Sequence, residues 1–278
     1  MRLVIRFAIV ALALVAAQQA AAVGPWLWTV EGGPGIAAPG GDVRYVTELA
    51  GSATKVSAIG RKDGRTLRSV SVPGSWGLQA ATLGGDLTGL SHNGSLLVLT
   101  PPTRGEQLAA STFFLVHTPA LTKAGTIRLA GDYTVDTLSP DGQMLYLIQH
   151  VVGPDVSSYQ VRAYDLRARK LLRRVVADRR EAGWTMRGYP VTRTTNNTGS
   201  RVYTLYQNTN SYPFIHALDT VAGTAVCIGL PLSRTDPNIL ANVTLTLSHG
   251  DRTLTVRGPH LGSPVIVDTH TFQITSDR

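Results

Sequence analysis

The strongest constraint on the fold of this chain is a turn-and-strand unit that returns about every 50 residues. In the copy at residues 138–149, LSPDGQMLYLIQ, Pro140 presets φ for a turn, Asp141 can bond its own backbone, and Gly142 accepts a positive φ. The residues after the glycine alternate as in a β-strand. The other copies are PGGDVRYVTEL at 39–49, LSHNGSLLVLT at 90–100, NTGSRVYTLYQ at 197–207 and LSHGDRTLTVRG at 247–258.

A second pair of strand-like runs joined by a turn follows each copy, so each repeat supplies about four strands. One such sheet cannot bury both of its faces, and circular stacking of similar sheets covers them. No segment shows sustained helical periodicity. We therefore predict an all-β fold, a β-propeller of five blades, with a six-bladed or irregular propeller as the alternative. The predicted units are residues 24–78, 79–132, 133–182, 183–235 and 236–278.

Residues 138–166 carry a resemblance to a known family. The run LSPDGQMLYLIQH followed by YQVRAYDL resembles the bacterial YVTN-type and tryptophan–aspartate (WD)-repeat-like β-propellers, whose blades run Ser-Pro-Asp-Gly, a tyrosine-bearing strand and a strand ending in Asp. Asp219 and Asp268 follow similar strands, whereas Gly60 and Thr118 stand where Asp165 stands in the third unit. The resemblance implies an exported repeat protein and transfers no active site, because the matching residues are those that build blades.

The N-terminal region has the pattern of a signal peptide. Arg2 and Arg6 precede an apolar run, and small residues lead to an expected cleavage after Ala22. The apolar run is much shorter than the roughly 20 residues that a membrane-spanning helix needs. We expect a signal peptide at 1–22, with retention as an anchor as the alternative, and a single domain at 23–278. The mature chain is then secreted or extracytoplasmic, monomeric and without a stable membrane span.

The aromatic run from Trp26 to Val30 is predicted to be a short strand with two candidate roles. It can complete the last blade and so close the ring, or it can be an isolated edge strand or an ordered tail. Cys227 is the only cysteine, so no intrachain disulfide can form. Its apolar neighbours predict a small buried residue rather than a reactive thiol.

The sequence shows no local catalytic signature. It contains no GxSxG elbow and no phosphate-binding loop, and none of its histidines has the paired spacing of metal ligands. The weak candidates for a metal site assembled from several blades are His117, His150 and His216, and the alternative is that they are turn or rim histidines. We predict no cofactor.

Three aspartates, Asp165, Asp219 and Asp268, end predicted strands just before turns. A repeated carboxylate could line a channel and bind cations. Because an Asp side chain readily accepts hydrogen bonds from the backbone amides that follow it, we instead predict turn caps.

The densest basic segment runs over residues 167–180, in a chain whose formal net charge is +8. It is predicted to be the outer strand of the third unit, where positive charge prevents strand addition by another chain. The alternative is an anion-contact patch for cell-wall polymer, lipid headgroup or acidic protein. Export argues against nucleic acid as a partner. The candidate patch residues are Arg167, Arg169, Lys170, Arg173 and Arg174.

The polar loop YQNTNSYPF at residues 206–214 is bracketed by aromatic residues. Aromatic rings beside amides suit contact with carbohydrate or peptide, which makes Tyr206, Asn208, Asn210 and Tyr212 candidate ligand residues. The alternative is a surface hairpin whose rings pack on the blade.

These observations favour an exported, non-catalytic propeller that acts as a binding or scaffolding module for an unknown protein or cell-envelope polymer. The alternative is a lactonase-like hydrolase or an oxidoreductase with its site at one mouth of the central channel. Clustered buried carboxylates or histidines at that mouth would favour the enzyme. A channel lined by threonine, valine and backbone would favour the binding module.

Overall fold

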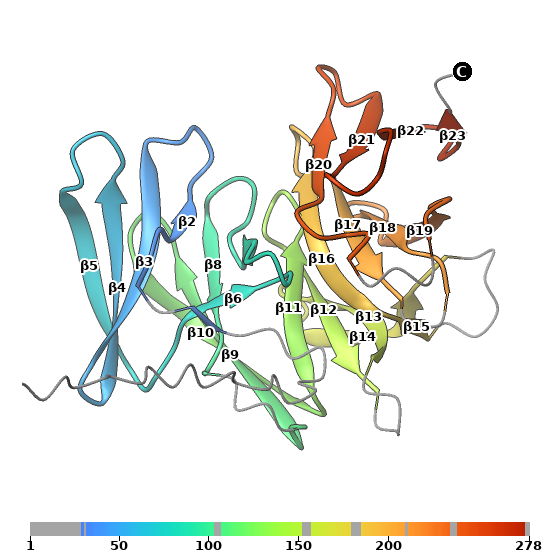
Figure 1. Ribbon diagram of the computed structural model, residues 1–278. Helices are drawn as coiled ribbons and strands as arrows, with labels where there is room; N and C mark the ends of the chain where they lie inside the picture. The colour runs from blue at the N-terminus through green and yellow to red at the C-terminus, as the bar shows by residue number, and fades with distance from the viewer. Residues whose placement is uncertain are drawn as a thin grey trace, which may run out of the picture.

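The computed structural model describes residues 29–30, 32–102, 107–151, 157–178, 185–208, 211–233 and 238–275. These residues form strands and turns, arranged as a series of antiparallel sheets (Figure 1). None of them belongs to a helix long and apolar enough to cross a membrane. The predicted signal peptide at 1–22 and the tryptophans of the N-terminal run lie outside the described residues.

Four of the sheets have four strands that pair in chain order, which identifies them as blades. Each lies within one of the predicted units, and β15 (Met186–Arg187) adds to blade 3 by pairing with β13. Blade 1 contains β2 (Ile36–Ala37), β3 (Val43–Ala50), β4 (Ala53–Gly60) and β5 (Thr66–Pro73). Blade 3 contains β11 (Tyr133–Leu138), β12 (Met144–His150), β13 (Ser158–Asp165) and β14 (Lys170–Val176). Blade 4 contains β16 (Tyr189–Thr195), β17 (Arg201–Gln207), β18 (Phe214–Asp219) and β19 (Thr224–Gly229), and blade 5 contains β20 (Thr244–Leu247), β21 (Thr253–Arg257), β22 (Val265–Asp268) and β23 (Ile274–Thr275).

Blade 2 is less regular. Its outer part is a sheet of β8 (Leu96–Leu99), β9 (Ala110–His117) and β10 (Thr122–Ala130), with β10 at the edge. The innermost strand, β7 (Leu87–Thr88), joins this sheet through an antiparallel bridge between Leu90 and Leu97. On its other side β7 pairs with β6 (Leu78–Ala80), which pairs with β1 (Thr29–Val30).

The predicted turn chemistry is present in blade 3. Gly142 has φ +71°, and the Asp141 carboxylate accepts hydrogen bonds from the Ser139 hydroxyl at 2.6 Å and from the Gln143 backbone N–H at 3.0 Å. These bonds fix the turn that aligns β11 with β12. They also hold the pKa of Asp141 below its usual range, with the Ser139 hydroxyl contributing most.

The strand-ending aspartates cap turns, as predicted. Asp219 accepts hydrogen bonds from the backbone N–H groups of the second and third residues after it, at 3.0 and 2.8 Å. Asp268 makes the same pair of bonds, at 2.9 and 2.8 Å, and Asp165 accepts one from Ala168 at 2.7 Å. The carboxylates therefore bind backbone groups of their own turns, which indicates a role in stabilising the turns rather than in cation binding.

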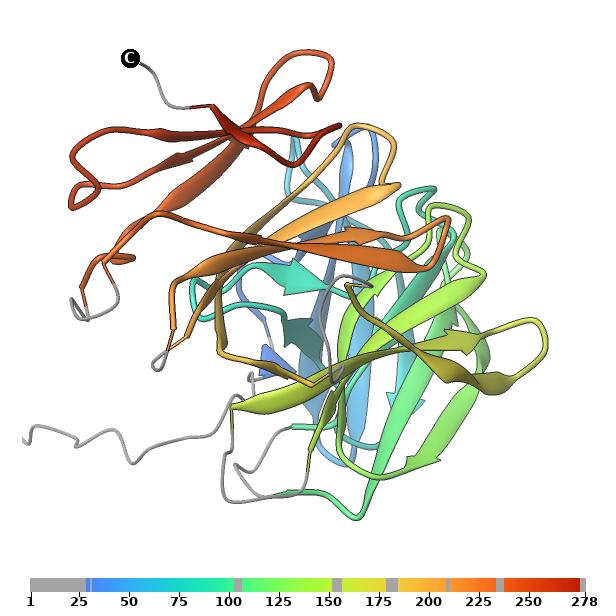
Figure 2. The same ribbon diagram turned by 90° about the vertical axis from the view of Figure 1, so that its right-hand side faces the viewer.

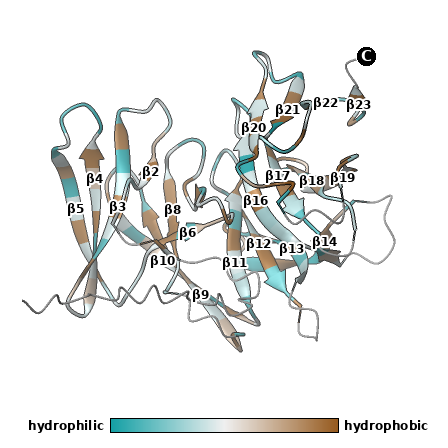
Figure 3. Cartoon of the chain, viewed as in Figure 1, coloured by the Kyte–Doolittle hydropathy of each residue, from teal (hydrophilic) through white to brown (hydrophobic). Residues whose placement is uncertain are grey.

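The apolar core lies between the blades, and each neighbouring pair encloses one cluster. Figure 3 shows hydrophobic residues along strands such as β4 and β8, where the sheets face one another. Full burial of one such leucine or valine contributes about 1.5–3 kcal/mol. Examples exposed by no more than 1% are Val56 and Leu97 between blades 1 and 2, Phe113 and Leu147 between blades 2 and 3, Val161 and Leu218 between blades 3 and 4, and Leu205 and Leu254 between blades 4 and 5.

Among the described residues, no such core joins blade 5 back to blade 1. Figure 1 places these two blades at opposite sides of the molecule, and Figure 2 shows blades 3 to 5 as successive layers. The free face of blade 5 is mostly polar: along β20 and β21, Thr246 and Thr255 alternate with the buried Leu245 and Leu254. Ile266, which pairs with Thr255, is partly exposed on the same face. A mostly polar face needs little apolar cover.

The role of ring closure proposed for the N-terminal strand is wrong for the part that the structure describes. Thr29 and Val30 pair with Gln79 and Leu78 of β6, not with a strand of blade 5. The Thr29 hydroxyl donates a hydrogen bond of 2.9 Å to the carbonyl of Pro101. This strand therefore joins the inner side of blade 2, as an edge strand.

Candidate functional site

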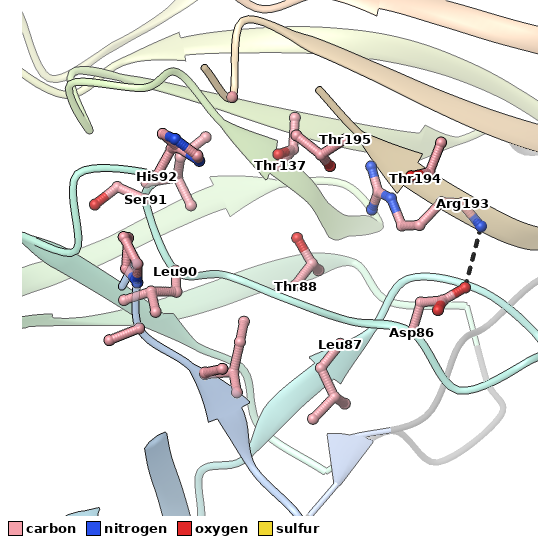
Figure 4. A pocket seen from close by; sticks show the side chains of 16 residues that line it. Asp86, Leu87, Thr88, Leu90, Ser91, His92, Thr137, Arg193, Thr194 and Thr195 are labelled. Atoms are coloured by element: carbon pink, nitrogen blue, oxygen red, sulfur yellow. Dashed lines mark hydrogen bonds between the residues drawn. The ribbon is translucent and has the colours of Figure 1, made fainter. Parts of the chain in front are cut away.

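The first strands of blades 1 to 4 surround a cavity of about 390 Å³, which we name the channel cup (Figure 4). Its polar lining is rich in hydroxyl groups, and its apolar lining is aliphatic. The hydroxyl-bearing side chains include Thr88, Thr137, Thr194 and Thr195, and the aliphatic ones include Ile36, Leu87, Leu90 and Leu138. Asp86, His92 and Arg193 complete the polar lining.

Arg193 is the basic centre of the cup and is held by blade 3. Its Nη1 donates to the backbone carbonyl of Asp136 at 2.8 Å, and its Nη2 donates to the Asp136 carboxylate Oδ1 at 3.0 Å. The two side chains are only 9% and 8% exposed. A buried pair of this kind keeps both charges only because each is neutralised and hydrogen-bonded by the other.

Asp86, the carboxylate that lines the cup, is hydrogen-bonded to the cup wall through one of its two oxygens. Its Oδ2 accepts hydrogen bonds from the Thr82 hydroxyl at 2.7 Å, the Arg193 backbone N–H at 3.1 Å and the Thr192 hydroxyl at 3.3 Å. Figure 4 shows the bond between Asp86 and Arg193 as a link across the cup wall. Asp86 thereby ties the loop before β7 to β16.

One rule of sequence position explains why these residues meet. Thr88, Asp136 and Arg193 each lie six residues before the turn glycine of their blade, at Gly94, Gly142 and Gly199 respectively. Equivalent positions of successive blades face the same central space. Accordingly, the Thr88 hydroxyl donates to the Asp136 carbonyl at 2.6 Å and Arg193 contacts the same residue from the other side.

Three hydroxyl groups of the cup are free to bind a ligand. Within the part of the chain that the structure describes, the side chains of Thr137, Thr194 and Thr195 make no hydrogen bond with protein. Figure 4 shows Thr137 and Thr195 close to each other beside the Arg193 side chain. Hydroxyl groups above an aliphatic lining can orient a ligand, because each one both donates and accepts a hydrogen bond.

The three candidate metal histidines are not brought together. His117 is exposed at the end of β9, His150 is 5% exposed at the end of β12, and His216 is 2% exposed in β18. The described residues contain no group of three His, Cys, Asp or Glu that could hold a metal ion. The histidine site is therefore not formed in this part of the chain, because strand order distributes the three residues over three blades.

The two buried histidines, His150 and His216, each lie close to a side chain of the same blade. His150 Nε2 lies 3.2 Å from the Thr134 hydroxyl, and His216 Nδ1 lies 3.7 Å from the Cys227 sulfur. Burial lowers the pKa of His150, against an opposing effect of Asp132. Burial also lowers the pKa of His216, against opposing effects of Asp136 and Asp178.

The candidate ligand loop is divided. Tyr206 is 3% exposed and stacks between Tyr159 and Phe214, with ring centroids 5.1 and 5.2 Å away, so it belongs to the core rather than to the loop surface. Burial raises the pKa of the Tyr206 phenol accordingly. Asn208 and Tyr212 line a separate hollow of about 330 Å³, and Asn210 lies outside the described residues.

Cys227 departs from its predicted burial. It is partly exposed and lines the same hollow as Asn208 and Tyr212. Its backbone N–H donates to the buried carboxylate of Asp178 at 2.7 Å. The short apolar context could not reveal this placement, because Asp178 comes from the end of blade 3.

The candidate basic patch is also divided. Arg173 and Arg174 are exposed on β14, which is the outer strand of blade 3, as predicted for this segment. Lys170 is exposed at the start of the same strand and pairs in register with Asp165. Arg167 and Arg169 instead line a groove of about 510 Å³ between blades 2 and 3.

Sequence reasoning missed Asp86, Asp136, Arg193 and the threonines of the cup. No local motif marks them, since 57 residues separate Arg193 from Asp136 and 107 separate it from Asp86. Alignment of the repeats on their turn glycines would have found Thr88, Asp136 and Arg193.

The sequence matches no protein-family model and no curated protein sequence. Solved structures share its architecture. Hydrazine synthase from Kuenenia stuttgartiensis aligns with a TM-score of 0.51 and 13% identity, over 87% of this chain and 65% of that one. The β-propeller domain of Cps50 (Swd1) from Myceliophteria thermophila aligns with a TM-score of 0.50 and 11% identity, over 89% and 73%.

TolB from Acinetobacter baumannii aligns with a TM-score of 0.48 and 14% identity, over 87% of this chain and 54% of that one. The chain thus spans less than two thirds of the length of hydrazine synthase and of TolB. At these identities the likeness concerns the fold alone. The strand order, the inter-blade cores and the alignment with Cps50 together identify that fold as a β-propeller.

Proposed function

We propose that this protein is an exported, non-catalytic β-propeller that acts as a binding or scaffolding module in the cell envelope. The signal-peptide pattern at residues 1–22 supports export. The resemblance of residues 138–166 to YVTN-type propellers supports the same compartment. A rigid stack of sheets presents surfaces to a partner without requiring any reaction chemistry.

The observation that carries this proposal is that the Arg193 guanidinium and the carboxylates of Asp86 and Asp136 are hydrogen-bonded within the wall of the channel cup. A general acid or base needs a proton-exchanging group within reach of the substrate. Asp86 accepts three hydrogen bonds from the cup wall, and Asp136 is paired with Arg193 at 3.0 Å. The groups left to face a ligand are threonine hydroxyls, aliphatic side chains and the exposed His92. Hydroxyl and aliphatic groups suit recognition.

Variants of the cup threonines test this proposal. The pair Thr194→Val and Thr195→Val removes two hydroxyls from the cup at nearly constant volume. The matched control, Thr246→Val and Thr255→Val, removes two hydroxyls from the free face of blade 5. The purified exported chain is sedimented with isolated cell envelopes. We expect the cup variant to be retained less than the wild type, and the control to be retained like the wild type.

Two results would overturn the proposal. Equal retention of all three proteins would remove the cup as a recognition surface. Saturable hydrolysis of a lactone or a carboxyl ester that is lost in the Thr194 and Thr195 variant would instead make the cup a reaction centre.

A further inference from the structure

A second hollow, separate from the channel cup, lies between blades 2 and 3 and has a volume of about 510 Å³. We name it the basic groove. One wall is residues 124–127 of β10, and the opposite side comes from the turns of blade 3. The side chains that matter here are Leu115, His117, Gln143, Leu166, Arg167 and Arg169.

The groove is basic, and its two arginine side chains are exposed. It is lined by His117, Arg167 and Arg169 and by no carboxylate. Within the described residues, neither guanidinium makes a hydrogen bond or an ion pair. The nearby carboxylates of Asp141 and Asp165 are committed to their turns, where they accept backbone N–H groups at 3.0 and 2.7 Å. Both arginines are exposed, so an anionic ligand would replace water at their guanidinium groups with charge-assisted hydrogen bonds.

The groove floor is apolar. Leu96, Leu115, Ile127, Tyr164 and Leu166 all line it and belong to the contact between blades 2 and 3. A purely ionic polymer, such as a polyphosphate, has nothing to place against these side chains. A ligand that carries both apolar groups and carboxylates uses the whole groove.

The wall formed by β10 adds a backbone edge. A β-bulge between Lys123 and Gly125 leaves Ala124 without a partner in β9, and four consecutive residues, 124–127, line the groove. β10 is the outermost strand of its sheet and, within the described residues, pairs only with β9. A Cβ placed at Gly125 would meet no atom within 4 Å, so the sheet face is open at this position. Unpaired strand edges accept extended peptides.

We propose that the basic groove binds an extended, acidic segment of a partner protein. Its carboxylates pair with Arg167 and Arg169, and its alternate apolar side chains cover Leu115 and Leu166. The groove shares no residue with the channel cup. The two sites can therefore be tested independently, and failure of one leaves the other standing.

A labelled eight-residue peptide of alternating valine and glutamate is the probe, with binding to the exported chain followed by fluorescence anisotropy. The groove variant is Arg167→Asn with Arg169→Asn, since asparagine tolerates the positive φ of 52° at position 169. The control is Arg173→Asn with Arg174→Asn, which removes the same charge from β14. We expect the groove variant to raise Kd about tenfold or more and the control to change it little.

Two further ligands distinguish the kind of anion. A serine–glutamate peptide of the same length keeps the charge and removes the apolar side chains, and inorganic polyphosphate keeps only charge. We expect both to bind more weakly than the valine–glutamate peptide. If either binds as tightly, the groove is a general polyanion site and the proposal fails. It fails equally if both arginine variants weaken binding alike, because that result reports net surface charge.

Discussion

The guanidinium of Arg193 and the carboxylate of Asp136 lie 3.0 Å apart and join the innermost strands of blades 3 and 4. The residues occupy the same position of successive repeats, six residues before the turn glycine. Each charge has lost most of its water, so each depends on the other. This relationship sets the alignment of two neighbouring blades and at the same time removes a carboxylate from the chemistry of the channel.

Breaking this pair from one side should be strongly destabilising. In Arg193→Met the buried Asp136 carboxylate loses its partner, which we expect to lower the free energy of unfolding by about 3–5 kcal/mol. The double variant Arg193→Met with Asp136→Leu leaves no unpaired charge, so its free energy of unfolding should fall markedly less than that of the single variant. The free energies of unfolding of the single variant, the double variant and the control below are measured by urea unfolding. Arg174→Met, at an exposed position, serves as the control, and a double variant as unstable as the single one would contradict the assignment.

Acid should weaken the fold through the two buried histidines. Burial lowers the pKa of both His150 and His216 in the folded chain, so below about pH 6.5 the unfolded chain takes up protons that the folded chain does not. Stability is therefore complete above that pH and falls as the pH drops toward the lowered pKa values, by at most about 1.4 kcal/mol per pH unit for each histidine. Unfolding midpoints in urea between pH 7.5 and 5 measure this slope. His216→Gln should reduce it, and the exposed His117→Gln should not.

Gly199 should tolerate alanine less well than Gly250 does. Both glycines have positive φ, 71° and 80°, so both substitutions cost about 1–2 kcal/mol in backbone strain. Only at Gly199 would the new Cβ overlap the Cβ of His92, which rotation of the side chain cannot move, whereas the space beside Gly250 is open. We expect Gly199→Ala to be the more destabilising by at least about 1 kcal/mol in thermal or urea unfolding. In a His92→Gly background, which removes that Cβ, the two costs should become equal, and a persistent difference would exclude this contact as the cause.

Removing the exposed arginines of β14 should promote self-association. Arg173 and Arg174 lie on an unpaired sheet edge, where charge opposes addition of a strand from another molecule. Arg173→Val with Arg174→Val should therefore give concentration-dependent assembly in sedimentation velocity. Lys62→Val with Arg65→Val removes the same charge from an exposed turn of blade 1 and should remain as monodisperse as the wild type. Equal assembly of both variants would attribute the effect to net charge.

Much of the fold could be predicted because its signals are local. The run from Ser139 to Gln143 specifies its turn through bonds between near neighbours, and strand alternation marks the face that packs against the next blade. The turn-capping role of Asp219 and the outer position of Arg173 followed from the same reasoning. Each depends on residues a few positions apart, so the sequence contains the whole interaction.

The candidate site was less accessible to this reasoning. Tyr206 looked like a loop aromatic because it adjoins a polar segment, yet it stacks on Tyr159 of the preceding blade. Arg167 and Arg169 were predicted as part of one basic strand, whereas the structure separates them from Arg173 and Arg174. Spacing along the chain does not report which blade a side chain faces.

The sequence alone determined that the chain builds repeated small sheets with capped turns, because hydrophobic alternation and turn chemistry act over a few residues. Only the tertiary structure decided that Arg193 neutralises Asp136 and that the cup presents free threonine hydroxyls. It also showed that, among the described residues, no apolar core joins blade 5 to blade 1. These features depend on how blades are placed relative to one another. That placement is set by packing between side chains that are distant in sequence, and no short sequence pattern encodes such contacts.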